Sequence, residues 1–191
     1  AANFIDYGVD GLYTWFLPWP LGPVERSLLT ELSDHPRLGK GDKQYYLRRQ
    51  DPLAAKTGYH ASLPLTIPGE RLGILHRIPF HVSDDLQSES AKPHQVILRL
   101  NIFDLVTADK LTVHLNGQSL ADELCYRSPS SQLEPYYGQW LEFHLSSILP
   151  RKGENVIEIS LDSRPPELEA AIRVEDVELI IRYGLYPFGL T

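Results

Sequence analysis

The sequence predicts a mainly-β chain: an antiparallel β-sandwich over residues 51–191, preceded by a helix-containing extension over residues 1–50. Three observations predict this fold. Apolar and polar residues alternate with period two from about residue 60, turn residues separate the alternating runs, and helical spacing is confined to one stretch near the N-terminus. A chain of 191 residues suits one domain with a short extension, since folding buries roughly 70% of the extended surface at this size.

The extension is expected to form a strand, a helix and a second strand. The apolar run 11–16 predicts the first strand, and Pro23 stands at the favoured first position of the helix. The apolar face of this helix would consist of Val24, Leu28, Leu29 and Leu32. The helix is expected to end near residues 33–36, and residues 43–48 predict the second strand.

The sandwich is predicted from short alternating runs, each with one apolar face and one wet face. The clearest runs cover residues 96–102, 111–115, 141–145, 157–161 and 177–183. Asn116-Gly117 predicts a tight hairpin turn because both residues tolerate positive φ, and residues 152–155 predict another turn before a strand. No crossover helix is predicted between these runs, so two antiparallel sheets packed face to face are expected.

Composition excludes several classes of partner and site. Eighteen basic against 25 acidic residues give a net charge of −7, which opposes binding to nucleic acid. No apolar run reaches the roughly 18 residues of a membrane span, so no membrane partner is expected. The single cysteine, Cys125, rules out an internal disulfide and a cysteine-based zinc site. The absence of methionine favours a fragment of a longer protein.

Two parts of the chain resemble known families. The first part resembles the last strand and helix of a glycoside-hydrolase (β/α)8 barrel in the segments GVDGLYTW (8–15), LLTEL (28–32) and KQYY (43–46). The second part resembles a galactose-binding-like jelly-roll domain, as appended to bacterial glycosidases, in the segments LTVHLNG (111–117), KGEN (152–155) and VEDVEL (174–179).

The resemblance implies the tail of a larger polysaccharide-acting protein, extracellular or periplasmic, in which this chain is a non-catalytic carbohydrate-binding accessory domain. The implied partners are a poly- or oligosaccharide and the chain's own upstream catalytic domain. No cofactor is required. A structural calcium ion is compatible with the resemblance, and its candidate side-chain ligands are Asp84, Asp85 and Glu178.

The best candidate for sugar binding is the aromatic pair Tyr136-Tyr137, in a stretch rich in Ser, Pro, Gln and Gly. Aromatic rings offer a flat apolar platform for a pyranose face, and the polar partners nearby in the sequence are Glu134, Gln139 and Arg127. The alternative is that one tyrosine anchors the loop into the core. Tyr59-His60 is a second candidate, for which a packing role is favoured.

Other conspicuous residues favour structural roles. Trp140 precedes an amphipathic strand and is expected in the core, and Trp15 and Trp19 are expected to plug the space between helix and sandwich. Asp176 and Glu178 share a strand face and are interpreted as solvated charges. No carboxylate pair for glycoside hydrolysis and no Gly-x-Ser-x-Gly elbow is found, so the chain itself is not expected to be an enzyme.

A different function is also open. The same sandwich could serve as a ligand-free module that docks on a catalytic barrel or pairs subunits. This alternative predicts an apolar patch formed by Trp15, Trp19, Val24 and Leu28.

Overall fold

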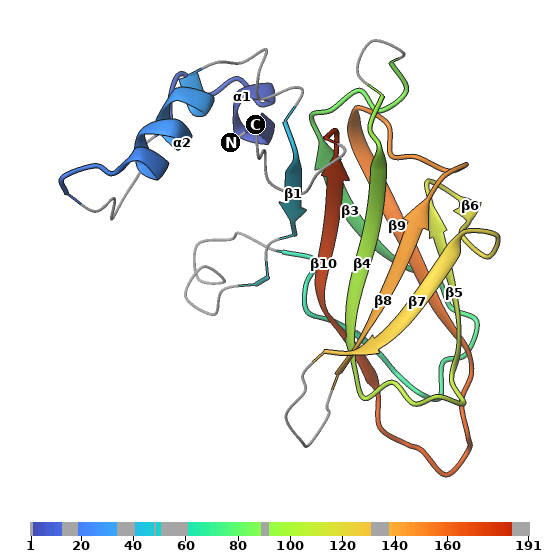
Figure 1. The fold of residues 1–191 in the computed structure, drawn as a ribbon. Helices are drawn as coiled ribbons and strands as arrows, with labels where there is room; N and C mark the ends of the chain where they lie inside the picture. Colours follow the sequence, from blue (N-terminus) through green and yellow to red (C-terminus); the bar gives the residue numbers. More distant parts are fainter. Residues whose placement is uncertain are drawn as a thin grey trace.

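The protein is a sandwich of two antiparallel sheets (Figure 1), as the sequence predicts. The computed structural model describes residues 2–12, 19–33, 41–47, 49–50, 61–88, 92–130 and 138–184. The larger sheet has the order β1 (Lys43–Tyr46), β10 (Ile172–Arg182), β4 (Gln95–Phe103), β8 (Gly138–Leu145) and β7 (Leu124–Pro129), with β2 (Leu65–Ile67) also paired to β10. The smaller sheet has the order β3 (His76–Val82), β9 (Gly153–Ser163), β5 (Lys110–Leu115) and β6 (Gln118–Ser119).

The core lies between the sheets and is filled mainly by alternate residues of β3, β4, β5, β8, β9 and β10. On β4, Leu98 and Leu100 are at most 1% exposed, and on β9 Ile157 and Ile159 are fully buried. Four of the five predicted runs lie entirely within strands β4, β5, β8 and β9, and the fifth extends one residue beyond β10. The alternation was therefore a correct guide, because its apolar members face the water-free layer between the sheets.

The Asn116-Gly117 turn joins β5 to β6 as predicted. Both residues have positive φ, 52° and 78°, the combination that a type I′ hairpin turn requires. The Asn116 side chain also ties the turn to β9: its Oδ1 accepts from Val156 N at 2.9 Å, and its Nδ2 donates to Asn155 Oδ1 at 2.8 Å. At the other predicted turn, Gly153 has a φ of 91°.

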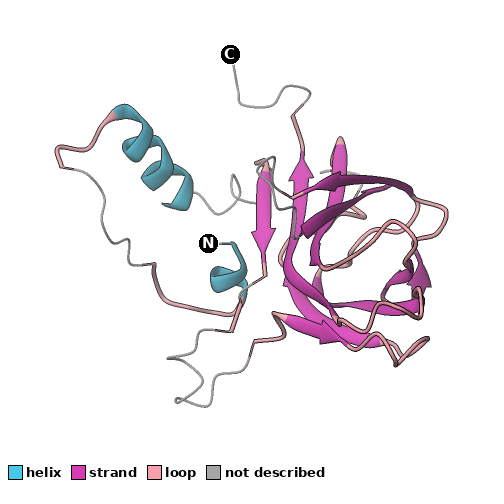
Figure 2. Cartoon of the chain, turned by 90° about the horizontal axis from the view of Figure 1, so that it is seen from below, coloured by secondary structure: helices cyan, strands magenta, loops and turns pink. Residues whose placement is uncertain are grey.

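Helix α2 (Pro23–Ser33) begins at the predicted proline, but its apolar face is not covered by the described part of the sandwich. Val24 is 68% exposed and Leu28 50%, and Figure 2 shows both helices to one side of the strands. The predicted plug is wrong for Trp19, which is 86% exposed. Trp15 and most of the predicted 11–16 strand lie outside the described residues.

Helix α1 (Ala2–Asp6) is tied to the smaller sheet through one histidine. His81 on β3 presents Nε2 to Asp6 Oδ2 at 2.6 Å and Nδ1 to Glu154 Oε1 at 2.8 Å. The Tyr7 ring packs 4.4 Å from the imidazole, and Lys152 Nζ lies 3.6 Å from Asp6. Burial opposes the charged form, but the hydrogen bonds to Glu154 and Asp6 outweigh it and raise the pKa of His81 above its usual value.

We predict that the contacts of His81 with Asp6 and Glu154 weaken as the pH rises. Because the pKa of His81 is raised in the folded state, the histidine adds to the free energy of unfolding. This contribution is fully present below the pKa of the unfolded state, about 6.5, and is lost as the pH rises through the pKa of the folded state. In urea denaturation, His81→Gln should therefore lower the free energy of unfolding more at pH 6 than at pH 9. Exposed His94, changed to Gln, is the control and should show no such trend. A pH-independent deficit for His81→Gln would contradict the prediction.

Candidate functional site

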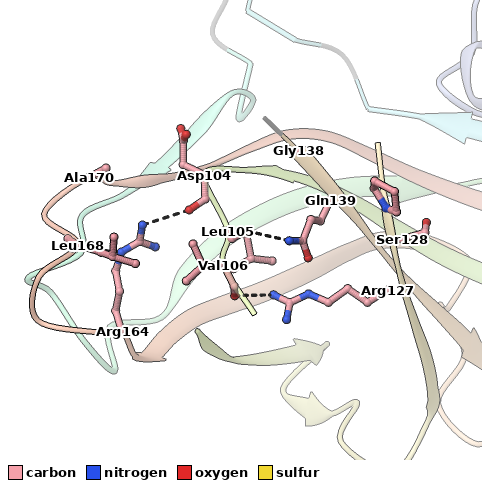
Figure 3. A pocket seen from close by; sticks show the side chains of 11 residues that line it. Asp104, Leu105, Val106, Arg127, Ser128, Gly138, Gln139, Arg164, Leu168 and Ala170 are labelled. Atoms are coloured by element: carbon pink, nitrogen blue, oxygen red, sulfur yellow. Dashed lines mark hydrogen bonds between the residues drawn. The ribbon is translucent and has the colours of Figure 1, made fainter. Parts of the chain in front are cut away.

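A cavity lies at one end of the sandwich, where β7 and β8 meet the segments 104–106 and 164–170 (Figure 3). Its volume is about 770 Å³, and we call it the end pocket. Two of its lining residues, Arg127 and Gln139, are among the predicted sugar-binding residues. The walls also include the apolar side chains of Leu105, Val106, Pro129, Leu168 and Ala170.

Arg127 and Gln139 come from neighbouring strands and support the same loop. Gln139 Nε2 donates to Leu105 O at 2.9 Å, and Arg127 Nη2 donates to Val106 O at 3.2 Å. Each side chain makes only this hydrogen bond to the described residues, as Figure 3 shows for the pocket. Within the described part of the chain, Gln139 Oε1 and the other guanidinium N–H groups have no hydrogen-bond partner.

The opposite wall of the end pocket is fixed by Arg164. This buried side chain donates to Asp109 Oδ2 at 2.9 Å, to Asp104 O at 3.1 Å and to Leu168 O at 3.2 Å. Breaking the ion pair between Arg164 and Asp109 would leave an uncompensated buried charge. Because that is strongly destabilising, the pair holds this wall of the pocket in place. At the floor, Gly138 is required because an added Cβ would lie 2.7 Å from the Phe103 ring.

The other predicted sugar-binding residues, Glu134, Tyr136, Tyr137, Tyr59 and His60, lie outside the described residues. Their roles stay predictions. Ser130 and Gly138 are the described residues on either side of the stretch that carries Glu134, Tyr136 and Tyr137. They are joined by a hydrogen bond from Ser130 N to Gly138 O at 2.9 Å. Gly138, the described residue that follows this stretch, lines the end pocket.

The three candidate calcium ligands do not gather in the structure. Asp84 is buried and binds Lys43, Tyr45 and Tyr183. Asp85 accepts from Gln87 N at 3.3 Å in a local turn, whereas Glu178 lies on the outer face of the larger sheet. Among the residues that the structure describes, no three His, Cys, Asp or Glu side chains form a group suited to a metal ion.

The interpretation of Asp176 and Glu178 as solvated charges is wrong. They are only 5% and 7% exposed, although they lie on the outer face of the larger sheet. Asp176 accepts from Tyr46, from Arg49 Nε at 2.8 Å and from Asn101 Nδ2 at 2.9 Å. Burial alone would raise the pKa of Asp176, but these hydrogen bonds outweigh burial and lower it.

Glu178 belongs to a row of paired side chains that crosses five of the six strands of the larger sheet. The register places in this row Tyr46, Glu178, Arg99, Glu142 and Tyr126. Arg99 bridges both carboxylates, at 3.2 Å from Glu178 and 3.1 Å from Glu142. Opposite charges on adjacent strands thus shield one another from water.

The expected core position of Trp140 is also wrong. Its neighbour Leu141 faces the core, so Trp140 points to the outer face of β8. There the Arg99 guanidinium lies 4.3 Å from the ring centroid, a cation–π contact. The sequence did not reveal this role because Arg99 lies 41 positions away, on strand β4. The contact depends on the register of β4 with β8, which pairs 141 with 100 and 140 with 101.

Comparisons with known proteins add no family to this geometry. No protein-family model matches the sequence, and no curated protein shows significant similarity to it. Among the described helices, none has the length and apolar character needed to cross a bilayer.

We predict that the Asp176 network stabilises the fold in its ionised form. Asp176→Asn should lower the free energy of unfolding by roughly 2 kcal/mol at pH 7, since hydrogen bonds to a charged group each contribute about 1.5–3 kcal/mol. A lowered pKa gives stability that is present above about pH 3.9 and is lost as the pH falls through the folded value. Urea denaturation from pH 7 to pH 3 should thus show the difference shrinking.

The control for this prediction is Asp122→Asn, at an exposed position. It should change stability by less than about 0.5 kcal/mol at each pH. An Asp176→Asn variant as stable as the wild type at pH 7 would show that the network adds nothing to the charged form.

Proposed function

We propose that the chain is a non-catalytic carbohydrate-binding module and that its ligand occupies the end pocket. The observation that carries the proposal is the convergence of Arg127 and Gln139 on this cavity of about 770 Å³. Of the five residues predicted from this part of the sequence, Arg127 and Gln139 line the pocket, and Glu134, Tyr136 and Tyr137 lie outside the described residues.

The lining suits the mixed chemistry of a sugar. Pyranose rings present apolar C–H faces and polar hydroxyl edges, and the pocket offers apolar side chains beside a few hydrogen-bonding groups. Gln139 Oε1 can accept from a hydroxyl, and the Arg127 guanidinium can donate to one. Because these groups are few and the pocket is open, we expect dissociation constants between about 1 µM and 1 mM.

A binding role fits the described lining better than hydrolysis. Glycosidases use two carboxyl groups about 5–9.5 Å apart, and Asp104 is the one acidic residue in the described pocket lining. The proposal therefore assigns no bond cleavage to this chain.

This function predicts glycan binding that depends on the pocket. Affinity electrophoresis against a panel of polysaccharides should show retardation of the wild type by at least one glycan. Titration calorimetry with that glycan should then show affinity reduced about tenfold in Tyr137→Ala or Tyr136→Ala, since aromatic contacts contribute about 0.5–1.5 kcal/mol beyond burial, and severalfold in Gln139→Ala. Tyr126→Ala, an exposed tyrosine on the outer face, is the matched control. Retardation by no glycan would remove the proposal.

A second candidate, a docking module for the upstream catalytic domain, is favoured by one observation. Trp19, Val24 and Leu28 are 86%, 68% and 50% exposed, and these are the described members of the patch that this alternative predicts. Exposed apolar side chains on one helix face are typical of a contact surface. Here the sandwich would hold the catalytic domain rather than a sugar.

The docking candidate predicts that the isolated chain associates through α2. Light scattering at increasing concentration should show a rising mean mass for the wild type, because water is excluded when two such faces meet. The variant Val24→Glu/Leu28→Glu should remain monomeric. Leu75→Glu, in a sandwich loop where Leu75 is also 50% exposed, should associate like the wild type. Identical masses for all three proteins would count against docking through this helix.

A further inference from the structure

A second cavity opens at the edge of the sandwich, between β7–β8 of the larger sheet and β5–β6 of the smaller one. Its volume is about 300 Å³, and we call it the edge cleft. Its apolar walls are Leu111, Val113, Leu120, Leu141 and Phe143. Four of these five belong to the hydrophobic core and are at most 7% exposed, so the cleft reaches the core itself.

The cleft exists because the two sheets end differently at this edge. The smaller sheet ends in β6, a strand of two residues, whereas the larger sheet continues to β7, a strand of six. All six residues of β7 are exposed. Among the described strands, none of equal length faces the inner side of β7, and a cavity lies there.

Two side chains of β7 point to this space. Cys125 pairs with Phe143 and Arg127 with Leu141, and directly opposed residues of an antiparallel pair share one face of the sheet. Since Phe143 and Leu141 face the core, Cys125 and Arg127 face inward as well, and both line the cleft. Tyr126, between them, lies on the outer face.

The charges around the cleft leave Arg127 as the group open to a ligand. Both lining carboxylates are already engaged: Asp109 by Arg164 at 2.9 Å, and Glu123 by the backbone N–H groups of residues 146–148 at 2.8–2.9 Å. Those hydrogen bonds outweigh burial and lower the pKa of Glu123, which keeps it a satisfied anion. Arg127, in contrast, forms no ion pair within the described part of the chain.

We propose that the edge cleft binds a small apolar molecule that carries an anionic head group. The apolar part lies between the sheets against Leu120 and Phe143, and the head group meets the Arg127 guanidinium at the mouth. Charge-assisted hydrogen bonds from a guanidinium to a carboxylate are short and directional, and a mostly apolar cavity of about 300 Å³ with one such polar anchor has the character of a small-molecule site. This ligand lies in a different cavity from the glycan of the end pocket, and the two sites share Arg127.

The first test uses 1-anilinonaphthalene-8-sulfonate, an apolar dye with an anionic group. The 191-residue chain should give a saturable rise in dye fluorescence with one site per chain. Cys125→Trp places a large ring in the mouth and should abolish that site, whereas Tyr126→Trp, the same change on the outer face of the same strand, should keep it. Val24→Glu/Leu28→Glu should also keep it, which separates the cleft from the exposed face of α2. Dye binding that survives Cys125→Trp overturns the proposal.

The second test asks whether the head group matters. Octanoate should displace the dye about tenfold better than octan-1-ol, a difference of about 1.4 kcal/mol. In Arg127→Gln the two competitors should become equal, and Arg127→Lys should fall between Arg127→Gln and the wild type because lysine keeps the charge but not the planar fork. Equal displacement by octanoate and octan-1-ol in the wild type overturns the anionic part of the proposal.

A third measurement uses only the wild-type protein, so its result does not depend on whether a variant folds. Cys125 is exposed as a residue, but partial desolvation beside the cleft raises the pKa of its thiol, so alkylation by iodoacetamide is followed at about pH 9, where the reactive thiolate forms. Octanoate should slow the alkylation of Cys125 in the wild type in proportion to occupancy of the cleft. An alkylation rate that octanoate leaves unchanged, at concentrations that displace the dye, places the dye elsewhere and overturns the proposal.

Discussion

The unequal ends of the two sheets are the constraint on which the surface of this protein depends. A sandwich excludes water only where both sheets continue, and here β7 extends beyond the cover that the two-residue β6 provides. The same mismatch exposes all of β7, opens the edge cleft and turns Cys125 and Arg127 toward a space instead of a packed core. Because Arg127 also lines the end pocket, both cavities follow from the placement of this one edge strand.

The outer face of the larger sheet obeys a different constraint: charges on it must be satisfied by neighbouring strands. Asp176 of β10 takes its donors from Tyr46 on β1, from Arg49 and from Asn101 on β4. These contacts join residues 46–49 to a strand about 130 positions later. Removing water from a carboxylate is costly unless each oxygen finds a donor, so the network holds the first strand in a unique register as well as in place.

Much of the sandwich was predictable because alternation is a property of one strand at a time. Runs such as 96–102 show their apolar face without reference to any partner, and the Asn116-Gly117 turn is local in the same way. The errors have the opposite character. Trp140 and Asp176 each depend on side chains far away in the sequence, Arg99 on β4 in one case and Arg49 after β1 in the other. A sequence read strand by strand does not show which charged residues will meet.

The two cavities also differ in how far a single segment of the sequence predicts them. Arg127 and Gln139 line one cavity and flank the Tyr136-Tyr137 stretch in the sequence, and antiparallel pairing of β7 with β8 brings such flanking residues together. The edge cleft has no comparable signal. It arises because the smaller sheet, among the described strands, ends in the short β6 and has no strand as long as β7 opposite it. Its walls come from β5, β8 and the residues around β6 and β7. Chemistry at a connecting loop is therefore visible in one segment of sequence, whereas chemistry at an open edge follows only from the pairing order of both sheets.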